Sequence, residues 1–451
     1  MIEIVAIDTP ELGDRAYLAT DGVGAIVVDP QRDIDRVERV AAQRGVPITH
    51  VFETHIHNDY LTGGLALARS TGAAYHLNVA DRVSFARTPV ADGDRIDAGA
   101  MRIQVIGTPG HTFTHLAYAL SDQERVLAVF TGGSLLNGST GRTDLLGAEH
   151  ELALTKAQFA SAHRLAAQLP GSAAVYPTHG FGSFCSATPT TGGASTMADE
   201  MRVNPVLTRS ETDYVTELLA GLDAYPAYYA HMSSGNTAGP SAPDLTPPRI
   251  ADASELRRRI DAGEWVVDLR SRTAFAAGHL VGSLNFELDT SFATYLGWLI
   301  PWSMPLTLIG DTPEAVATAQ RDLCRIGIDR IEAAATGQPA VWAANASLEQ
   351  FPSVDFTLLA GRADRSSLVV LDVRLHGEWQ QGYIEGSLHI PLHQLAHRMD
   401  DIPAGEIWVH CGGGYRAAIA ASLLAARGRQ VVAVDDNFSV AAEAGLPVVT
   451  R

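Results

Sequence analysis

Histidine side chains follow apolar segments at several places in the first half of the chain. His55 and His57 stand on either side of one residue, shortly after the apolar segment Ile48–Phe52. On a turn, this spacing lets both imidazole rings face one metal ion, and imidazole and carboxylate are ligands that iron and zinc accept. The sequence therefore predicts a transition-metal site with five candidate ligands: His55, His57, Asp59, His111 and His179.

A cysteine opens a glycine-rich loop late in the sequence. Residues 411–416 read Cys-Gly-Gly-Gly-Tyr-Arg, between an apolar segment at 407–410 and a helical pattern at 417–427. The N–H groups of such a loop and the dipole of the following helix stabilise a thiolate, and glycines let the backbone curl round an anion or a terminal sulfur. We predict that Cys411 is a nucleophile and that Arg416 neutralises an anionic substrate. The residues between them are predicted to bind that substrate: Gly412, Gly413, Gly414 and Tyr415.

The other two cysteines differ in their surroundings. Cys185 follows His179 by six residues, so it is either a residue of the metal pocket or a small structural residue. Cys324 lies in an apolar helical segment, which favours a place in a hydrophobic core. Three cysteines among 451 residues do not make a disulfide framework, so a reducing compartment, the cytoplasm, is expected.

The composition argues against two classes of partner. The chain has 51 acidic and 33 basic residues, a formal net charge of −18. Such a chain repels phosphate backbones, so no nucleic-acid partner is expected. No apolar run reaches the roughly 18 residues that a membrane span requires, so no membrane is expected either. A homo-oligomer is compatible with these observations.

Alternating strand and helix patterns position the candidate residues. Short apolar segments such as 24–28, 48–52 and 101–107 are typical of buried strands. The histidines lie just after such segments, where α/β folds place their sites. A stretch rich in glycine and proline at 233–248 is predicted to be a linker that ends a first domain at residues 1–245.

After this linker the sequence repeats itself. Two pairs of segments match in the same order and at similar spacing: 265–270 with 368–374, and 278–285 with 382–389. Two α/β domains of ordinary size are therefore predicted, at residues 246–352 and 353–451. The first copy has no cysteine at the position of Cys411.

The histidine motifs resemble the metallo-β-lactamase superfamily, whose mark is H-x-H-x-D-H. Residues 55–60 follow that pattern through the aspartate. Three further segments resemble the persulfide dioxygenases of the superfamily, which are related to the glyoxalase II hydrolases: 108–112, 130–132 and 141–144.

This resemblance implies an α/β fold, an αββα sandwich, over residues 1–245. In the persulfide dioxygenase branch one iron is held by two histidines and one aspartate. The resemblance implies that the histidine ligands are His55 and His111, and that Arg142 and Asp144 contribute to substrate binding.

Two positions depart from the family pattern. Tyr60 stands where the superfamily has the last histidine of its motif, which argues against a second metal ion. Gly133 stands where the persulfide dioxygenases have their aspartate ligand, and glycine has no side chain with which to ligate.

Three outcomes are open for the metal site. His55, His57 and His111 could form a three-histidine site, with water in the open positions. Asp59 or Asp144 could instead supply the missing carboxylate, or the site could be vestigial. One transition-metal ion is expected, with Fe(II) as the first choice and Zn(II) as the alternative.

The second half of the chain resembles the rhodanese family. Residues 353–451 carry the Cys411 loop together with the family's motifs at 372–374 and 382–391. The resemblance implies that Cys411 accepts a sulfane sulfur, becomes a persulfide, and passes the sulfur to a nucleophile. The copy at 246–352 resembles an inactive rhodanese, a second rhodanese-like α/β domain without the loop cysteine.

The order of the domains resembles bacterial persulfide dioxygenase–rhodanese fusions. It implies that a low-molecular-weight thiol persulfide is oxidised to sulfite at the metal and that sulfur is transferred through Cys411, with thiosulfate or sulfite as partner substrate. Two alternatives stay open. One is a glyoxalase II-like thioester hydrolase, and the other is a sulfurtransferase with a degenerate metallo-β-lactamase module.

Overall fold

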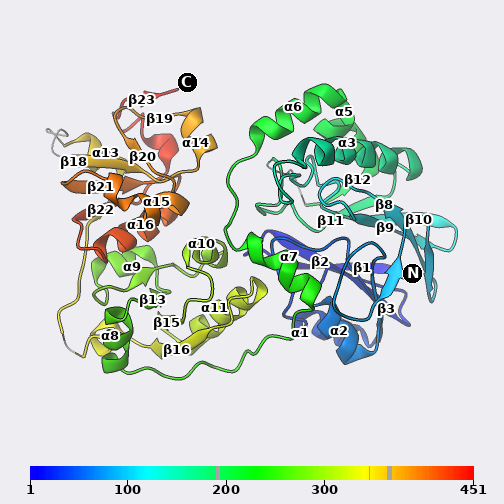
Figure 1. Ribbon diagram of the computed structural model, residues 1–451, viewed down its shortest axis with the longest axis horizontal. Coiled ribbons are helices and arrows are strands. Elements are labelled where there is room, and N and C mark those ends of the chain that lie inside the picture. Colours follow the sequence, from blue (N-terminus) through cyan, green and yellow to red (C-terminus); the bar gives the residue numbers. More distant parts are fainter. Residues whose placement is uncertain (189, 191–192, 345, 363–367, 451) are drawn as a thin grey trace. The chain divides into compact units, whose positions relative to one another are not determined.

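The computed structural model describes residues 1–450 except 189, 191–192, 345 and 363–367. The chain divides into two compact units (Figure 1): Met1–Asp244 with Cys324–Gly327, and Leu245–Leu323 with Ile328–Arg451. The predicted boundary between residues 352 and 353 falls inside the second unit and stays a prediction.

The first unit contains two six-stranded sheets. The first has the order β1-β2-β3-β4-β5-β6, with strands Glu3–Thr9, Asp14–Thr20, Ala25–Val28, Ile48–Phe52, Ala74–Asn78 and Thr88–Val90. The second has the order β12-β11-β10-β9-β8-β7, and β7 to β12 are Arg95–Ala98, Met101–Gly107, Leu116–Asp122, Arg125–Gly132, Ala174–Pro177 and Ser195–Thr196.

Alternation along the strands explains how these sheets pack. In β2, Tyr17 and Ala19 face a core that they share with Phe130 of the second sheet. Their neighbours Ala16 and Leu18 face the opposite way, into a core that contains residues of helices. Strands buried on both faces are apolar at nearly every position, as the sequence of β3 is.

Helices cover the outer faces of both sheets, so the expected αββα sandwich is confirmed. Apolar residues of α1 (Asp35–Arg44) and α2 (Gly64–Thr71) pack on the first sheet. Those of α3 (Glu151–Gln168) and α6 (Glu211–Gly221) pack on the second, as Figure 1 shows. The other helices of this part are α4 (Met197–Val203), α5 (Pro205–Thr208) and α7 (Tyr229–Ala238).

The predicted linker at 233–248 is wrong over its first residues, because α7 extends through Ala238. The helix is held by buried Asn236, whose amide nitrogen donates to the carbonyl oxygens of His57 at 2.9 Å and Tyr60 at 2.8 Å. Its amide oxygen accepts from the backbone N–H of Thr62 at 2.9 Å. These tertiary hydrogen bonds stabilise a helix in a stretch whose composition favours a loop.

The candidate metal ligands all lie at one edge of the sandwich. In the first sheet β3, β4 and β5 are parallel, and the segment with His55, His57 and Asp59 follows β4. In the second sheet β8, β10 and β11 run in one direction, so His111 after β8 and His179 after β11 lie at the same end. The sheet topology therefore brings distant parts of the sequence together.

The second unit contains two main sheets. The order of the first is β14-β13-β15-β16, with β13 to β16 at Trp265–Asp268, Leu284–Asn285, Leu306–Gly310 and Ile331–Thr336. Its helices are α8 (Ala253–Asp261), α9 (Arg272–Ala277), α10 (Phe292–Leu299), α11 (Pro313–Arg325, which ends in the segment grouped with the first unit) and α12 (Pro339–Trp342).

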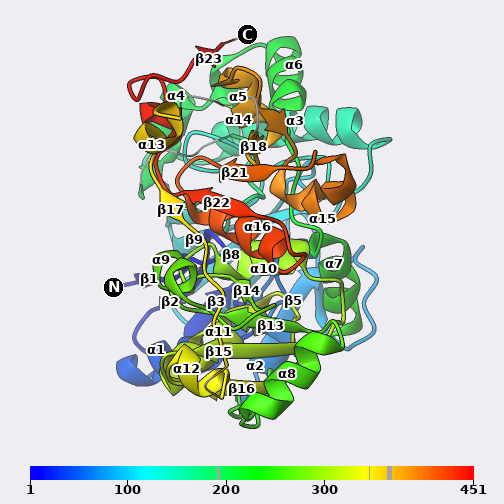
Figure 2. The same cartoon turned by 90° about the vertical axis from the view of Figure 1, so that its left-hand side faces the viewer.

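The order of the other sheet is β17-β22-β21-β18-β20, with strands Ser353–Val354, Val431–Val434, Glu406–His410, Leu368–Asp372 and Leu388–His389. The helices are α13 (Phe356–Ala360), α14 (His376–Gln381), α15 (Leu395–Arg398) and α16 (Tyr415–Ala425), with 3-10 turns at Leu392–Gln394, Met399–Asp401 and Phe438–Val440. A separate pair joins β19 (Tyr383–Ile384) to β23 (Val448–Val449). Figure 2 shows α16 against β21 and β22.

The two sheets repeat the same local geometry. In each, a central strand ends in an aspartate whose carboxylate pairs with the arginine two residues later: Asp268 with Arg270, and Asp372 with Arg374, both at 2.6 Å. Each arginine also donates to a glycine carbonyl eight residues further on. The repeat seen in the sequence is thus present in the structure down to single hydrogen bonds.

Within the described ranges, no helix combines the length and the hydropathy that a membrane crossing would need.

Removing Arg374 should destabilise the second unit strongly. The Asp372 side chain is fully buried and that of Arg374 is 4% exposed, so Arg374→Ala leaves an uncompensated carboxylate. We expect a loss of about 3 kcal/mol in the free energy of unfolding, measured by urea denaturation. Arg398→Ala, which breaks the exposed pair with Asp401, is the matched control and should cost less than about 1 kcal/mol. Equal losses in the two variants would contradict the expectation.

Candidate functional site

Three of the five predicted metal ligands converge in the first unit. One ring nitrogen from each of His55, His111 and His179 lies within 4.8 Å of the others. The Nε2 atoms of His55 and His179 are 3.4 Å apart, and all three side chains are buried. Three imidazole nitrogens at this separation can hold one transition-metal ion between them.

The opposite nitrogen of each ring is held by a partner in the protein. The three contacts of Nδ1 are with Thr54 Oγ1 at 2.8 Å for His55, with the Arg142 carbonyl oxygen at 2.7 Å for His111, and with Asp14 Oδ1 at 2.8 Å for His179. His111 Nε2, in contrast, is buried without a hydrogen-bond partner. Metal-binding histidines are oriented in this way, because the bond at one nitrogen leaves the other directed at the metal.

Burial keeps two of these rings neutral. Loss of solvation, with other imidazoles close by, lowers the pKa of His55 well below its ordinary value and that of His111 to about 3. Neutral imidazole is the form that binds a metal ion. His179 differs, because the carboxylates of Asp59 and Asp14 overcome the effect of burial and raise its pKa.

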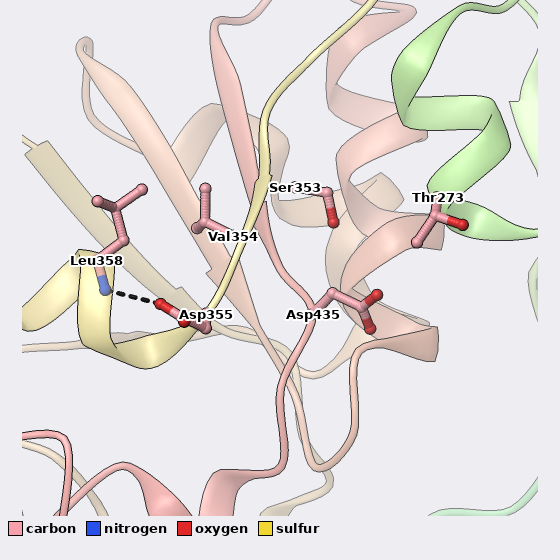
Figure 3. A pocket seen from close by; sticks show the side chains of 6 residues that line it. All are labelled: Thr273, Ser353, Val354, Asp355, Leu358 and Asp435. Carbon is pink, nitrogen blue, oxygen red and sulfur yellow. Dashed lines mark hydrogen bonds between the residues drawn. The ribbon is translucent and has the colours of Figure 1, made fainter.

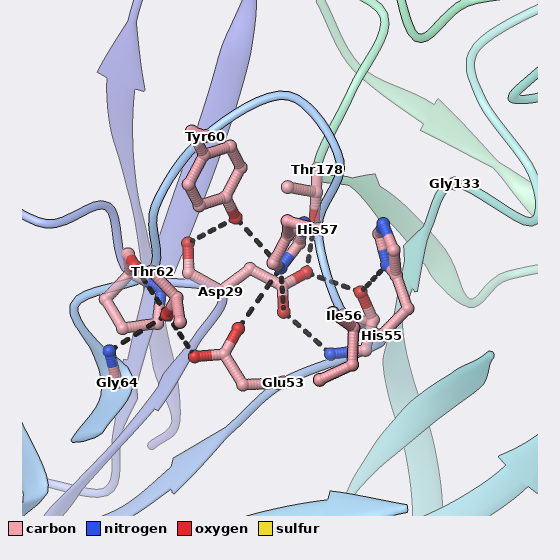
Figure 4. Close-up of polar contacts among 12 residues, drawn as sticks. Asp29, Glu53, His55, Ile56, His57, Tyr60, Thr62, Gly64, Gly133 and Thr178 are labelled. Carbon is pink, nitrogen blue, oxygen red and sulfur yellow. Dashed lines mark hydrogen bonds and ion pairs between the residues drawn. The ribbon is translucent and has the colours of Figure 1, made fainter. Parts of the chain in front are cut away.

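His57 is held in a separate acidic network, drawn in Figure 4. Its Nε2 lies 3.1 Å from Glu53 Oε2, 3.3 Å from Asp29 Oδ1 and 3.0 Å from the Tyr60 hydroxyl. Burial alone would lower the pKa of His57, but the Asp29 and Glu53 carboxylates raise it to about 9. Only Nδ1 of this ring is without a partner, so His57 can reach a metal ion through Nδ1 alone.

Asp59 lies next to His179. Its Oδ2 is 3.0 Å from His179 Nδ1, and one ligand atom each of His57, Asp59 and His179 lies within 4.8 Å of the others. Asp14 shares the same nitrogen, and burial followed by the charge of Asp59 raises the pKa of Asp14 to about 8. Asp59 therefore stands beside the three-histidine cluster, within reach of His57 and His179.

Gly133 is in contact with the His111 ring. A Cβ added at Gly133 would lie 2.6 Å from His111 Cγ and 2.8 Å from its Nε2, so the two cannot coexist without a shift. A side chain at position 133 therefore requires the His111 ring to move from the position it has in this structure.

Arg142 and Asp144 form a bidentate ion pair, with both contacts at 2.7 Å. The guanidinium also donates to the carbonyl oxygens of Phe184 at 3.2 Å and Asp223 at 2.7 Å, and stacks over the Tyr225 ring at 4.5 Å. These contacts join three segments of the chain. Substrate binding by this pair stays a prediction, and among the described clusters of possible ligands Asp144 does not occur.

Cys185 belongs to the surroundings of the histidine cluster. The buried thiol lies 3.8 Å from the Tyr229 hydroxyl. Burial, followed by the nearby charges of Asp59 and Asp14, raises its pKa. This position agrees with the alternative that Cys185 is a residue of the metal pocket.

The residues that orient the histidine segments are not among those predicted from the sequence. Asp29 follows the apolar strand β3, as the histidines follow theirs, and this signal could have found it. It accepts from the backbone N–H and the hydroxyl of Thr54, both at 2.7 Å. Asp14 opens β2 and Asn236 lies on α7, outside any motif, so only the fold shows their roles.

The cysteine loop has the arrangement that its sequence predicts. Cys411 follows β21 directly, Gly414 precedes the first turn of α16, and the thiol-bearing residue is 1% exposed. Gly414 has a left-handed φ of +87°, which glycine adopts without strain. The loop therefore places a cysteine between a strand end and a helix N-terminus, where N–H groups stabilise an anion.

Arg416 is paired within the protein. Its two terminal nitrogens donate to Glu378 at 2.5 and 2.7 Å, and this carboxylate raises the pKa of the guanidinium against the effect of burial. Neutralisation of an anionic substrate by Arg416 stays a prediction, and it requires Arg416 to share its charge with Glu378.

Comparison with known proteins agrees with both parts of this description. Residues 356–441 match the model of the rhodanese-like domain. Over 208 residues the chain is 29% identical to human mitochondrial persulfide dioxygenase ETHE1, covering 45% of this chain and 72% of the relative. Over 174 residues it is 32% identical to hydroxyacylglutathione hydrolase of Brucella anthropi, covering 36% and 62%.

The structure also superposes on a crystal structure of a metallo-beta-lactamase from Staphylococcus aureus, with a TM-score of 0.67 and 26% identity. The match covers 75% of this chain and 99% of that one. The chain thus joins a metallo-β-lactamase-fold region, related to persulfide dioxygenase and with buried clusters suited to a metal, to a C-terminal rhodanese-like domain.

Gly133→Ala should disturb the metal centre, because the added Cβ displaces His111. We expect the affinity for Zn(II) or Co(II) to fall by about tenfold or more, measured by calorimetric titration of metal-free protein. Gly221→Ala, at a position in α6 where an added Cβ meets nothing within 4 Å, is the control. Unchanged metal affinity in Gly133→Ala would show that His111 is not a ligand.

Proposed function

We propose that this protein oxidises a low-molecular-weight thiol persulfide at a metal centre in its first unit and transfers sulfane sulfur through Cys411 in its second. The observation that carries the proposal is the convergence of His55, His111 and His179, each with Nδ1 held by the protein. The similarity to persulfide dioxygenase and to the rhodanese-like domain supports the two chemistries.

The residues present fit one transition-metal ion. His55, His111 and His179 would hold it, and the buried, unpartnered Nε2 of His111 is the clearest sign of a missing ligand partner. A bound ion would supply a Lewis-acid centre and, if it is Fe(II), the redox chemistry for oxidation by O₂; Zn(II) is the alternative. Burial of the three rings excludes water around them, and the bond of His179 to Asp14 increases its basicity as a ligand.

The overall oxidation balances without a further reductant. A persulfide RSSH, O₂ and water give the thiol RSH, sulfite and two protons. The sulfane sulfur is oxidised and O₂ is reduced. The carrier is released as the free thiol RSH, and its group R is not changed by the reaction.

The proposed transfer at Cys411 is a pair of exchange reactions. The Cys411 thiolate attacks the outer sulfur of thiosulfate, which breaks the sulfur–sulfur bond, releases sulfite and leaves a persulfide on Cys411. A thiolate then takes the outer sulfur and restores Cys411. Backbone N–H groups of the loop and the dipole of α16 stabilise the anionic sulfur in both steps.

The copy at 246–352 is proposed to be a rhodanese-like domain without the cysteine. Its parallel strand pairing and its Asp268–Arg270 pair match those of the C-terminal domain. The loop after β15 reads Gly310-Asp311-Thr312-Pro313 and offers no nucleophilic thiol.

One alternative is a thioester hydrolase. It is favoured by the all-histidine donor set, which suits a single catalytic zinc, and by the similarity to hydroxyacylglutathione hydrolases. A further alternative is a sulfurtransferase whose first unit does not turn over. These functions differ in oxygen consumption and in thioester hydrolysis.

Iron-loaded protein should consume O₂ with glutathione persulfide and form sulfite. His111→Ala should lower this rate by about 100-fold or more, because it removes a metal ligand. An oxygen electrode and sulfite analysis provide the measurement. No O₂ consumption by metal-replete protein, together with hydrolysis of S-lactoylglutathione, would favour the hydrolase.

Cys411→Ser should separate the two activities. Transfer of sulfur from thiosulfate to cyanide should be abolished, because serine cannot form a persulfide, whereas O₂ consumption in the first unit should continue. Thiocyanate formation measures the transfer. Sulfur transfer that persists in Cys411→Ser would disprove the role of this cysteine.

A further inference from the structure

We propose that Arg272, in the copy whose loop carries no cysteine, is a positioning residue for the Cys411 loop. It holds the carboxylate of Asp435 against Gly414 and neutralises its charge. The inference rests on the proposed sulfur transfer at Cys411. It assigns the copy at 246–352 a part in that reaction, beyond the role of a spacer.

Arg272 begins α9 and joins two acidic residues. Its Nε donates to Asp435 Oδ1 at 2.7 Å, and its Nη1 donates to Glu287 Oε2 at 2.7 Å. The Arg272 side chain is 30% exposed and that of Asp435 is 19% exposed. Because both are partly shielded from water, their attraction is stronger than that of an open surface pair.

Asp435 supports the backbone of the cysteine loop. It follows β22, as Cys411 follows the neighbouring parallel strand β21. A Cβ added at Gly414 would overlap Asp435 Oδ1 and lie 3.0 Å from its Cγ. The Asp435 carboxylate therefore lies directly against the backbone of the loop at Gly414.

Tyr415, the next residue of the loop, also contacts the copy at 246–352. The Tyr415 hydroxyl donates to the carbonyl oxygen of Glu287 at 3.0 Å. The rings of Tyr295, on α10, and Tyr415 lie 5.8 Å apart. The Glu287 carboxylate thus accepts from Arg272, and its backbone carbonyl oxygen accepts from Tyr415. Both contacts depend on the same short segment.

The negative charge of Asp435 is the reason that Arg272 is expected to affect the sulfur chemistry. Sulfur on Cys411 is anionic as a thiolate and as a persulfide, and a lone carboxylate beneath Gly414 would oppose the N–H groups that stabilise it. Arg272 cancels this charge. Loss of the arginine should therefore weaken the reaction with thiosulfate more than it weakens the fold.

A cavity of about 510 Å³ lies beside Asp435, and Figure 3 shows the side chains that line it. Its lining residues are Thr273, Ser353, Val354, Asp355, Leu358 and Asp435. Because the Arg272 side chain is 30% exposed, water can enter the space that a changed side chain leaves, so a substitution at this position does not open a void in a packed core.

The test compares variants of the full chain in sulfur transfer from thiosulfate to cyanide. Arg272→Gln should lower kcat/KM by about tenfold, because the loop is displaced and an uncompensated carboxylate faces it. Arg272→Lys should keep most of the activity. The double variant Arg272→Gln with Asp435→Asn should recover much of the loss, because it removes the lone charge. Arg398→Gln, at an exposed pair, is the control.

A merely structural ion pair gives a different result. In that case the double variant is no more active than Arg272→Gln, and this outcome, or a wild-type kcat/KM in Arg272→Gln, overturns the inference. The rate at which iodoacetamide alkylates Cys411, followed by peptide mass spectrometry, gives a second readout and should fall in Arg272→Gln. If the wild-type chain transfers no sulfur, the proposed function fails, while the alkylation rates still decide the inference.

Discussion

The candidate metal centre depends on the hydrogen bonds at Nδ1 of three buried histidines. A buried imidazole has two polar nitrogens, and one must be held by the protein if the other is to face a metal ion. The partners come from different places: a threonine hydroxyl after β4, a carbonyl oxygen of the loop at 141–144, and a carboxylate at the start of β2. Both sheets of the sandwich are needed to supply them.

Tyr60 and Gly133, which depart from the motifs that the sequence resembles, both lie against histidine rings of this region. Tyr60 contacts His57 and donates to the Asp29 carbonyl oxygen at 3.3 Å, so His57 stays within the acidic network. Gly133 leaves the space that the His111 ring occupies. The cluster at this edge is composed of histidines, with Asp59 and Asp14 beside His179.

The same aspartate–arginine ion pair occurs twice in the second unit. In both copies a buried aspartate at a strand end is paired with an arginine two residues later, which fixes the chain as it leaves the sheet. Only one copy adds a cysteine loop to this frame. The copy without the loop cysteine still contacts its surroundings: the backbone carbonyl oxygen of Glu287 accepts from Tyr415 of the loop, and Arg272 donates to Asp435 beside it.

The sequence by itself determined the local elements and the candidate chemistry. Apolar strands followed by histidines, the cysteine loop and the internal repeat are local patterns, because strand periodicity and loop composition depend on neighbouring residues. The αββα sandwich and the grouping of His55, His111 and His179 at one edge agree with those patterns.

Only the tertiary structure decided which nitrogen of each ring is available. His57 looks equivalent to His55 in sequence, yet Glu53 and Asp29 hold its Nε2. Asn236 turns part of an expected linker into a helix through contacts with residues more than 170 positions away. These hydrogen bonds and ion pairs join residues that are distant in the sequence. Local sequence patterns therefore do not predict them.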